Sequence, residues 1–379
     1  MAKHIVVLGA GRVGRAMAEE MAERHHVTLT DIHQNALDRA VQRNPYLSTQ
    51  IADVTDRSAL QQAVSDADLV ISAVPGELGF KTAAAVVDAG KPLVDISFFA
   101  ENAFELDQQA KAANIPAVVD CGVAPGFSNL LLGYYDERMT VNRFTCLVGG
   151  LPKSAKPPFY YKAPFSPSDV IEEYIRPVRC RENGSDVTLE ALSGYEHVYF
   201  DKVGTVEAFN TDGLRTLMHT MPHIPEMKEK TLRYPGHAEA IRTLKSGGFL
   251  GEQPLPVKPD IHISPLEMTT QLLTRAWQME EDEEEFTVLR AIIHGRDNDG
   301  NERSITYDLY DEYNPATATS SMARTTGYTA TAVADLILDG QLTSTGIIPP
   351  EYIGRDETCF DYITGQLKKH GIEIKVSST

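Results

Sequence analysis

The sequence predicts an α/β chain that starts with a doubly wound parallel sheet, continues as an α+β region and ends in a helical segment. Three observations support this fold class. Short apolar runs alternate with helical patterns over residues 1–122, a glycine cluster follows the first run, and hairpin turns replace the alternation later. We therefore expect three parts, 1–122, 123–314 and 315–379, of which the last packs back against the first.

The alternation in the first part is regular enough to place its elements. Parallel strands joined by helices bind ligands beyond the carboxyl ends of the strands. The residues that follow the strands are therefore the first candidates for a binding site. The expected strands are 4–8, 27–30, 48–52, 69–74, 91–96 and 117–120, and the expected helices are 14–24, 34–44, 58–65, 80–89 and 101–113.

The later parts have a different pattern. Asn183-Gly184 and Asp299-Gly300 are turn dipeptides between paired strand patterns, which predicts two hairpins. The acidic run 280–285 lacks the alternating ligand spacing of a calcium loop, so we expect a solvated face there. Further expected elements are a helix at 130–135, a strand at 144–148, hairpin strands at 178–181, 186–192, 286–293 and 304–310, and helices at 323–340 and 356–371.

The turn after the first strand has the spacing Gly9-x-Gly11-x-x-Gly14 between an apolar run and a helical pattern. In that setting Gly9 makes the tight turn, Gly11 lets a pyrophosphate approach the backbone, and Gly14 lets helix and strand pack closely. The phosphates then meet free N–H groups at a helix N-terminus. The pattern predicts a Rossmann-type dinucleotide site, in which Asp31 accepts both ribose hydroxyls of NAD and repels a 2′-phosphate.

The expected cofactor is therefore NAD, since Ile32 and His33 supply no strong cation for a 2′-phosphate. An empty glycine turn with an ordinary strand-end aspartate is the alternative. The agreement of strand, glycines, helix and acid favours the dinucleotide. The residues expected to contact it are Gly9, Gly11, Arg12, Val13, Gly14, Asp31, Ile32, Asp53, Val54, Ala73, Val74, Pro75 and Ser97.

Composition narrows the classes of function. The chain has 379 residues, 42% hydrophobic and 23% charged, which is typical of a globular protein with more than one domain. Its net charge of −18 repels nucleic acid and anionic membranes, and no apolar run is long enough to span a bilayer. The four cysteines are scattered without a C-x-x-C pair, so we expect no metal site, no disulfide framework and a cytoplasmic location.

Three stretches offer groups that could act on a substrate. Cys121 begins a glycine-containing turn beyond the sixth expected strand, either a substrate-facing loop or a plain interdomain turn. Lys162 either takes part in proton transfer, if it is desolvated, or lies on the surface. Arg233 either binds a carboxylate with its guanidinium fork or forms a helix-end salt bridge. The residue types alone leave these choices open.

A resemblance bears on these choices. Besides the common glycine fingerprint, the chain has three more specific motifs, CGVAPG at 121–126, YKAPFSP at 161–167 and LRYPGH at 232–237. With these motifs, and over nearly its whole length, the sequence resembles the saccharopine dehydrogenase family, most of all its lysine 6-dehydrogenase branch. The resemblance implies a Rossmann domain, an inserted substrate and dimerisation domain, and a C-terminal return.

The resemblance also implies the chemistry. The family oxidises a C–N bond with NAD as hydride acceptor, and water hydrolyses the resulting imine. In the lysine branch the ε-amine leaves as ammonia, and the product is 2-aminoadipate 6-semialdehyde, which cyclises to piperideine-6-carboxylate. On this basis we expect a homodimer, catalytic roles for Lys162 and Asp120, and substrate contacts from Cys121, Tyr161, Asn210, Thr211, Arg233 and His237.

One departure separates the branches. Glutamate-forming saccharopine enzymes carry an Asn-Arg-Asp-Ser stretch whose arginine could hold a second substrate carboxylate. Here that stretch is Asn210-Thr211-Asp212-Gly213. We therefore favour L-lysine, a small amino acid, as the substrate. The alternatives are a saccharopine dehydrogenase, a carboxynorspermidine-type imine reductase, and a non-enzymatic NAD-sensing protein that shows no turnover with any amine.

Overall fold

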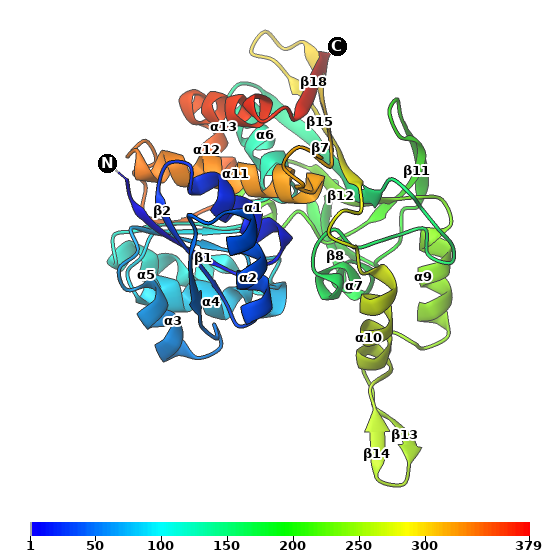
Figure 1. Ribbon diagram of the computed structural model, residues 1–379. Coiled ribbons are helices and arrows are strands. Elements are labelled where there is room, and N and C mark those ends of the chain that lie inside the picture. The colour runs from blue at the N-terminus through cyan, green and yellow to red at the C-terminus, as the bar shows by residue number, and fades with distance from the viewer. Residues whose placement is uncertain (1) are drawn as a thin grey trace.

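Two β-sheets form the framework of the chain, and a computed structural model describes residues 2–379 of it (Figure 1). All pairings in the first sheet are parallel. The predicted doubly wound parallel sheet is thus confirmed. Its strands lie in the order β17 (Gly346–Ile348), β6 (Pro116–Val118), β5 (Leu93–Asp95), β4 (Leu69–Ser72), β1 (His4–Leu8), β2 (His26–Asp31) and β3 (Ser48–Ile51).

Helices cover both faces of this sheet, which explains the uninterrupted apolar runs of its strands. In β1, Ile5 and Val7 belong to one core, and Val6 and Leu8 belong to the core on the opposite face. The helices are α1 (Arg12–Met21), α2 (Gln34–Arg43), α3 (Arg57–Val64), α4 (Gly76–Asp88), the short 3₁₀ helix η1 (Ala103–Leu106), α5 (Asp107–Ala112) and, from the C-terminal segment, α11 (Ser321–Leu338).

The second sheet is mixed and contains both predicted hairpins. Asn183 and Gly184 have φ of 50° and 75°, as a tight two-residue turn requires. Its strands lie in the order β10 (Glu196–Phe200), β11 (Gly204–Asn210), β12 (Glu226–Arg233), β7 (Thr140–Pro152), β15 (Glu285–Arg296), β16 (Glu302–Glu312) and β18 (Glu373–Ser378), while β8 (Val178–Glu182) pairs with β12 and with β9 (Ser185–Leu189).

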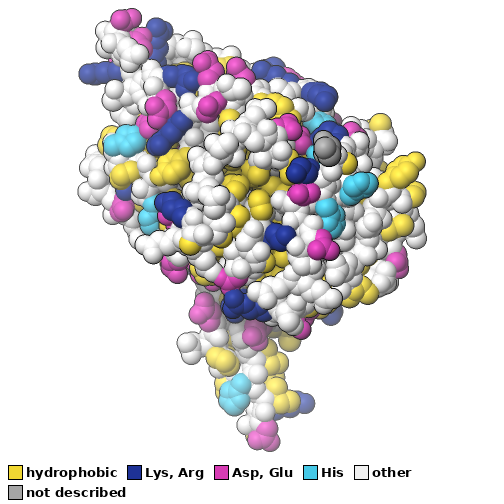
Figure 2. Space-filling view, turned by 90° about the vertical axis from the view of Figure 1, so that its left-hand side faces the viewer, with side chains coloured by type: hydrophobic (Ala, Val, Ile, Leu, Met, Phe, Trp, Pro, Cys, Tyr) yellow, Lys and Arg dark blue, Asp and Glu magenta, His cyan; other side chains and the backbone are white. Residues whose placement is uncertain are grey.

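A separate hairpin projects from the end of the molecule below α10 (Pro265–Trp277) (Figures 1 and 2). It consists of β13 (Leu255–Lys258) and β14 (Ile261–Ile263) and exposes the apolar side chains of Leu255, Val257 and Ile261.

No helix described over residues 2–379 is long and apolar enough to cross a membrane. The remaining helices are α6 (Phe127–Asp136), α7 (Pro167–Ile175), α8 (Leu217–Thr220), α9 (His237–Ser246), α10 (Pro265–Trp277), α12 (Pro350–Gly354) and α13 (Glu357–Lys369).

Two expectations about the later chain are wrong in part. The C-terminal segment was expected to be helical, but it also supplies β17 to the first sheet and β18 to the second. These strands are short and form because the edges of β6 and β16 are open to them. The acidic run is not wholly solvated, because Glu285 is fully buried and its carboxylate accepts the backbone N–H of Met322 at 3.0 Å.

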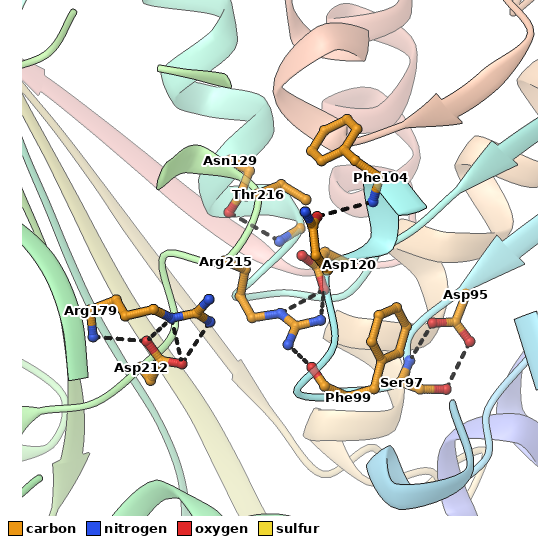
Figure 3. A network of polar contacts seen from close by, with 12 residues as sticks. Asp95, Ser97, Phe99, Phe104, Asp120, Asn129, Arg179, Asp212, Arg215 and Thr216 are labelled. Carbon is orange, nitrogen blue, oxygen red and sulfur yellow. Dashed lines mark hydrogen bonds and ion pairs between the residues drawn. The ribbon is translucent and has the colours of Figure 1, made fainter. Parts of the chain in front are cut away.

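One buried arginine joins the two sheets (Figure 3). Arg215, between β11 and α8, donates from Nε and Nη2 to Oδ1 of Asp120 at 3.0 and 2.8 Å. It also donates to the backbone carbonyl of Phe99. Asp120 follows β6 and Phe99 follows β5, so one guanidinium holds two strand-end loops of the first sheet against the second.

We predict that Arg215→Met destabilises the protein by about 3–5 kcal/mol, because it leaves the Asp120 carboxylate buried without its partner. Urea denaturation followed by circular dichroism measures this. The double variant Arg215→Met with Asp120→Asn should recover much of the loss, since it removes the uncompensated charge. Equal losses in the single and double variants would contradict this account of the junction.

Candidate active site

A cavity of about 720 Å³ lies between the two sheets, at the carboxyl edge of the parallel strands. The loops after β1 to β5 line one end of it, which we call the cofactor end. Residues of β7, β12 and α7 and of the loop after β11 line the other, the substrate end. Such a position at the strand ends is where open α/β sheets bind their ligands.

The glycine turn at the cofactor end is shaped to hold a phosphate group. A Cβ on Gly14 would lie 1.9 Å from the carbonyl oxygen of Gly9, so no larger residue fits between turn and helix. A Cβ on Gly11 would instead meet nothing within 4 Å, so this glycine borders open space. No side chain caps the N-terminus of α1, whose N–H groups remain available to an anion. The residues present therefore fit a dinucleotide pyrophosphate.

Asp31 is fixed at the end of β2 by two backbone N–H groups. Its carboxylate accepts from Ala10 in the glycine turn at 2.7 Å and from His33 at 2.8 Å. The side chain of Ile32 is exposed, and no Lys or Arg occupies residues 30–34. A carboxylate at this position can accept ribose hydroxyls of a dinucleotide.

All of the residues predicted to contact the cofactor line this cavity. Arg12 among them also donates from Nη2 to the carbonyls of Met279 and Glu280, at 2.7 and 2.8 Å. The guanidinium of this glycine-turn residue thus ties the first sheet to the segment that precedes β15.

The substrate end is built from one face of a strand and one face of a helix. Glu229, Thr231 and Arg233 alternate along β12, so their side chains point to the same side. Asp169 and Glu173 lie four residues apart on α7 and share its cavity face. The sequence-based reading found Arg233 but missed the other four. The alternating spacing within EKTLR (229–233) was the signal that could have revealed Glu229 and Thr231.

Arg233 is buried and held in place from several sides. Its Nη2 donates to Oε2 of Glu173 at 2.7 Å, and its Nε donates to the hydroxyl of Tyr174 at 3.1 Å. The guanidinium lies over the ring of Tyr161, 4.4 Å from its centroid. Burial raises the pKa of Glu173, and the positive charge of Arg233 opposes that rise.

The two residues expected to be catalytic do not line the cavity. Lys162 lies on the loop before α7, where its Nζ donates to the carbonyl of Gln278 at 2.7 Å and lies 4.0 Å from Glu283. Asp120 is occupied by Arg215 at the junction of the sheets. Their positions give no support to the expectation that either one moves a proton of the substrate.

Only some of the residues that were expected to contact the substrate line the cavity. Thr211 and Arg233 line the cavity, whereas Cys121, Tyr161, Asn210 and His237 lie behind its wall. Burial raises the pKa of the Cys121 thiol, which disfavours a nucleophilic thiolate. Burial lowers the pKa of His237 to about 3, and its ring bonds the hydroxyl of Tyr174 and the carbonyl of Phe159. These four residues thus lie behind the residues that line the cavity and are not part of the lining itself.

The carboxyl groups of the substrate end have unusual acidities. Burial, together with the neighbouring carboxylate of Glu173, raises the pKa of Glu229 to about 8. Burial also raises the pKa of Asp169 to about 6, although the backbone N–H of Gly76 donates to it at 3.1 Å. Over residues 2–379, no group of three or more His, Cys, Asp or Glu could hold a metal ion.

Comparison with known proteins identifies the family. A model described as the saccharopine dehydrogenase NADP binding domain matches residues 5–118, and a model described as the saccharopine dehydrogenase C-terminal domain matches residues 122–372. The chain belongs to the saccharopine dehydrogenase family. The resemblance read from the motifs is thus confirmed, and the family models divide the chain close to residue 120.

Individual members of the saccharopine dehydrogenase family are distant from this chain. A saccharopine dehydrogenase (NADP(+), L-glutamate-forming) from Saccharomyces cerevisiae is 23% identical over 446 aligned positions, covering 99% of this chain and 99% of that protein. An α-aminoadipic semialdehyde synthase from Arabidopsis thaliana is 24% identical over 286 positions, covering 66% of this chain but only 27% of that longer protein.

Solved structures support the fold of the saccharopine dehydrogenase family for the whole chain. Apo saccharopine dehydrogenase (L-Glu forming) from S. cerevisiae superposes with a TM-score of 0.79 at 21% identity, covering 100% of both chains. A homospermidine synthase from Legionella pneumophila superposes with a TM-score of 0.69 at 14% identity, covering 100% of this chain and 92% of that one.

We predict a pH-dependent difference in stability between the wild type and Glu229→Gln. The folded carboxyl has a pKa of about 8, above its unfolded value, so the folded state holds a proton that the unfolded state has lost. Wild-type stability should therefore fall relative to the variant by at least about 1 kcal/mol as pH rises from 5 to 8. Urea denaturation across this range measures the difference. A constant difference would contradict the buried, proton-bearing Glu229.

Proposed function

We propose that this chain oxidises the ε-amine of L-lysine with NAD as hydride acceptor. The C6–H hydride leaves to the cofactor, the amine becomes an imine, and water releases ammonia and 2-aminoadipate 6-semialdehyde, which cyclises. The family and the dinucleotide-shaped cavity support an oxidoreductase acting on a C–N bond. The choice of lysine rests on the charges at the substrate end.

The observation that carries the proposal is the single cation at the substrate end. Among the cavity-lining residues of the described chain, the Lys and Arg side chains are Arg12 at the cofactor end and Arg233 at the substrate end. Thr211 also lines the cavity, at the position where the glutamate-forming pattern has arginine. Arg233 alone can pair with one α-carboxylate through its planar fork. Lysine has one carboxylate, whereas saccharopine has three.

The residues of the cofactor end would hold NAD. The glycine turn and the N-terminus of α1 accept the pyrophosphate, and Asp31 accepts the ribose hydroxyls. The bound nicotinamide would take the hydride. The protein's own tasks are to orient the amine beside the strand-end loops, to exclude bulk water and to remove a proton.

Proton removal is needed because the ε-ammonium has a pKa of ~10.4, and C6 beside it cannot release a hydride while the nitrogen is positively charged. Asp169 is the carboxyl of the substrate end that contacts the cofactor end, through the N–H of Gly76 at the start of α4. A desolvated carboxylate there is a stronger base than one in water. We therefore assign proton acceptance to Asp169 in place of Lys162 and Asp120.

Saccharopine remains the second candidate substrate. The S. cerevisiae relative that aligns over nearly its whole length is a glutamate-forming saccharopine dehydrogenase by name, and it uses NADP(+). Oxidation of saccharopine without oxidation of lysine would favour this alternative. The homodimer and the cytoplasmic location stay predictions.

We predict that the protein binds NADH at least about tenfold more tightly than NADPH. The carboxylate of Asp31 repels a 2′-phosphate, and no Lys or Arg at residues 30–34 offsets it. Titration by nicotinamide fluorescence measures both affinities without any substrate. Asp31→Ser with Ile32→Arg should reverse the order, while Asp31→Asn, which removes only the charge, should reduce the preference. Equal affinities in the wild type would contradict the role of Asp31.

We predict that the protein reduces NAD with L-lysine, and that the rate rises from pH 7 to 10 as the ε-amine loses its proton. NADH absorbance with a panel of amines, saccharopine included, measures this. Arg233→Lys should raise KM about tenfold or more with little change in kcat, because it keeps the charge but loses the fork. Saccharopine as the one active compound would overturn the lysine assignment.

The same assay separates the candidate bases. Asp169→Asn, whose amide oxygen can still accept from Gly76, should lower kcat about 10²–10⁴-fold. Lys162→Ala should stay within a few-fold of the wild type, since Lys162 lies outside the cavity. A loss of about 10²-fold or more in Lys162→Ala would return the proton transfer to that lysine.

A further inference from the structure

The carboxylate of Glu229 stands out at the substrate end. Glu229 is 6% exposed and lines the cavity, and its carboxylate accepts no hydrogen bond from any side chain or backbone group of residues 2–379. Buried polar groups are normally bonded, and an unbonded carboxylate is among the costliest exceptions. An unpartnered acid that borders a cavity indicates that a ligand supplies the partner.

Glu229 differs from the carboxylates around it in having no arginine partner. The side chains that act on Glu229 are Glu173, Asp212 and Asp120, which raise its pKa, and Arg215, which lowers it. Each of the three other carboxylates has an arginine of its own, with Glu173 2.7 Å from Arg233, Asp212 2.8 Å from Arg179 and Asp120 2.8 Å from Arg215. Glu229 has none, so its carboxyl group holds a proton until a cation in the cavity supplies the missing partner and lets it ionise.

Gly213 provides the space that this carboxylate occupies. A Cβ on Gly213 would lie 1.5 Å from Oε1 and 1.9 Å from Cδ of Glu229. Any larger residue would therefore push the carboxylate away. Two residues before it, Thr211 also lines the cavity, where the glutamate-forming pattern has an arginine. The loop 211–213 thus both removes positive charge from the substrate end and admits a negative one.

We propose that Glu229, seated on Gly213, forms a cation subsite that binds the α-ammonium of the substrate and excludes a second carboxylate. The inference deepens the proposed function and rests on it. The reacting amine belongs beside Asp169, which contacts the cofactor end, so the non-reacting ammonium is the group left for Glu229. The substrate class is then a diamino acid, with the α-carboxylate on Arg233 and the α-ammonium on Glu229.

Calorimetry on the NADH-loaded protein, in which lysine cannot be oxidised, tests the subsite. The ligands are L-lysine and 6-aminohexanoate, which lacks the α-amino group. The wild type should bind lysine about tenfold or more tightly than 6-aminohexanoate. In Glu229→Gln the ratio should fall to nearly one, and Gly213→Ser should reduce it too, because the serine side chain displaces the carboxylate.

Glu226→Gln is the matched control, since Glu226 lies on the same strand but does not line the cavity, and it should keep the wild-type ratio. An unchanged ratio in Glu229→Gln, with lysine still oxidised, would overturn the subsite alone. Lysine bound through Glu229 but not oxidised would support the subsite and overturn the proposed reaction. A loss of kcat in Glu229→Gln with unchanged KM would show that Glu229 moves the proton instead, and absence of lysine binding would overturn both proposals.

Discussion

The buried ion pair between Arg215 and Asp120 is the constraint on which the rest of the molecule depends. A carboxylate and a guanidinium that are both nearly inaccessible to water must stay together, because separating them leaves a charge uncompensated. The same guanidinium binds the carbonyl of Phe99, so it fixes two strand ends of the first sheet against the second. The cavity lies between the two sheets that this junction holds together.

The two ends of that cavity differ in the charges that they present to a ligand. At the cofactor end, free N–H groups at the start of α1 offer positive potential, and Asp31 adds one localised negative charge at a defined place. At the substrate end, the carboxyl groups of Asp169, Glu173 and Glu229 face the single guanidinium of Arg233, so the lining favours a ligand with a positive charge. A net charge of −18 is therefore compatible with an anion site, because a few local donors decide the potential inside the cavity.

The family resemblance and this electrostatic arrangement answer different questions. Membership in the saccharopine dehydrogenase family explains the two sheets, the glycine turn and oxidation at a C–N bond. It does not choose the amine, since relatives with 21–24% identity can differ at every residue that contacts a substrate. In the proposed function, Thr211, Gly213, Glu229 and Arg233, which line the substrate end of the cavity, select the amine.

The sequence by itself determined the strands of the first sheet other than β17, both hairpins and the glycine turn of the cofactor end, because these depend on local patterns: apolar runs, turn dipeptides and glycine spacing. Only the tertiary structure decided the substrate end. Lys162 and Asp120 are close in sequence to residues that line the cavity. The amine of Lys162 nevertheless donates to the carbonyl of Gln278 outside the cavity, and the carboxylate of Asp120 pairs with Arg215. Glu229 and Gly213 lie 16 residues apart and interact only because β12 runs past the loop after β11, and strand pairing of that kind leaves no local trace in the sequence.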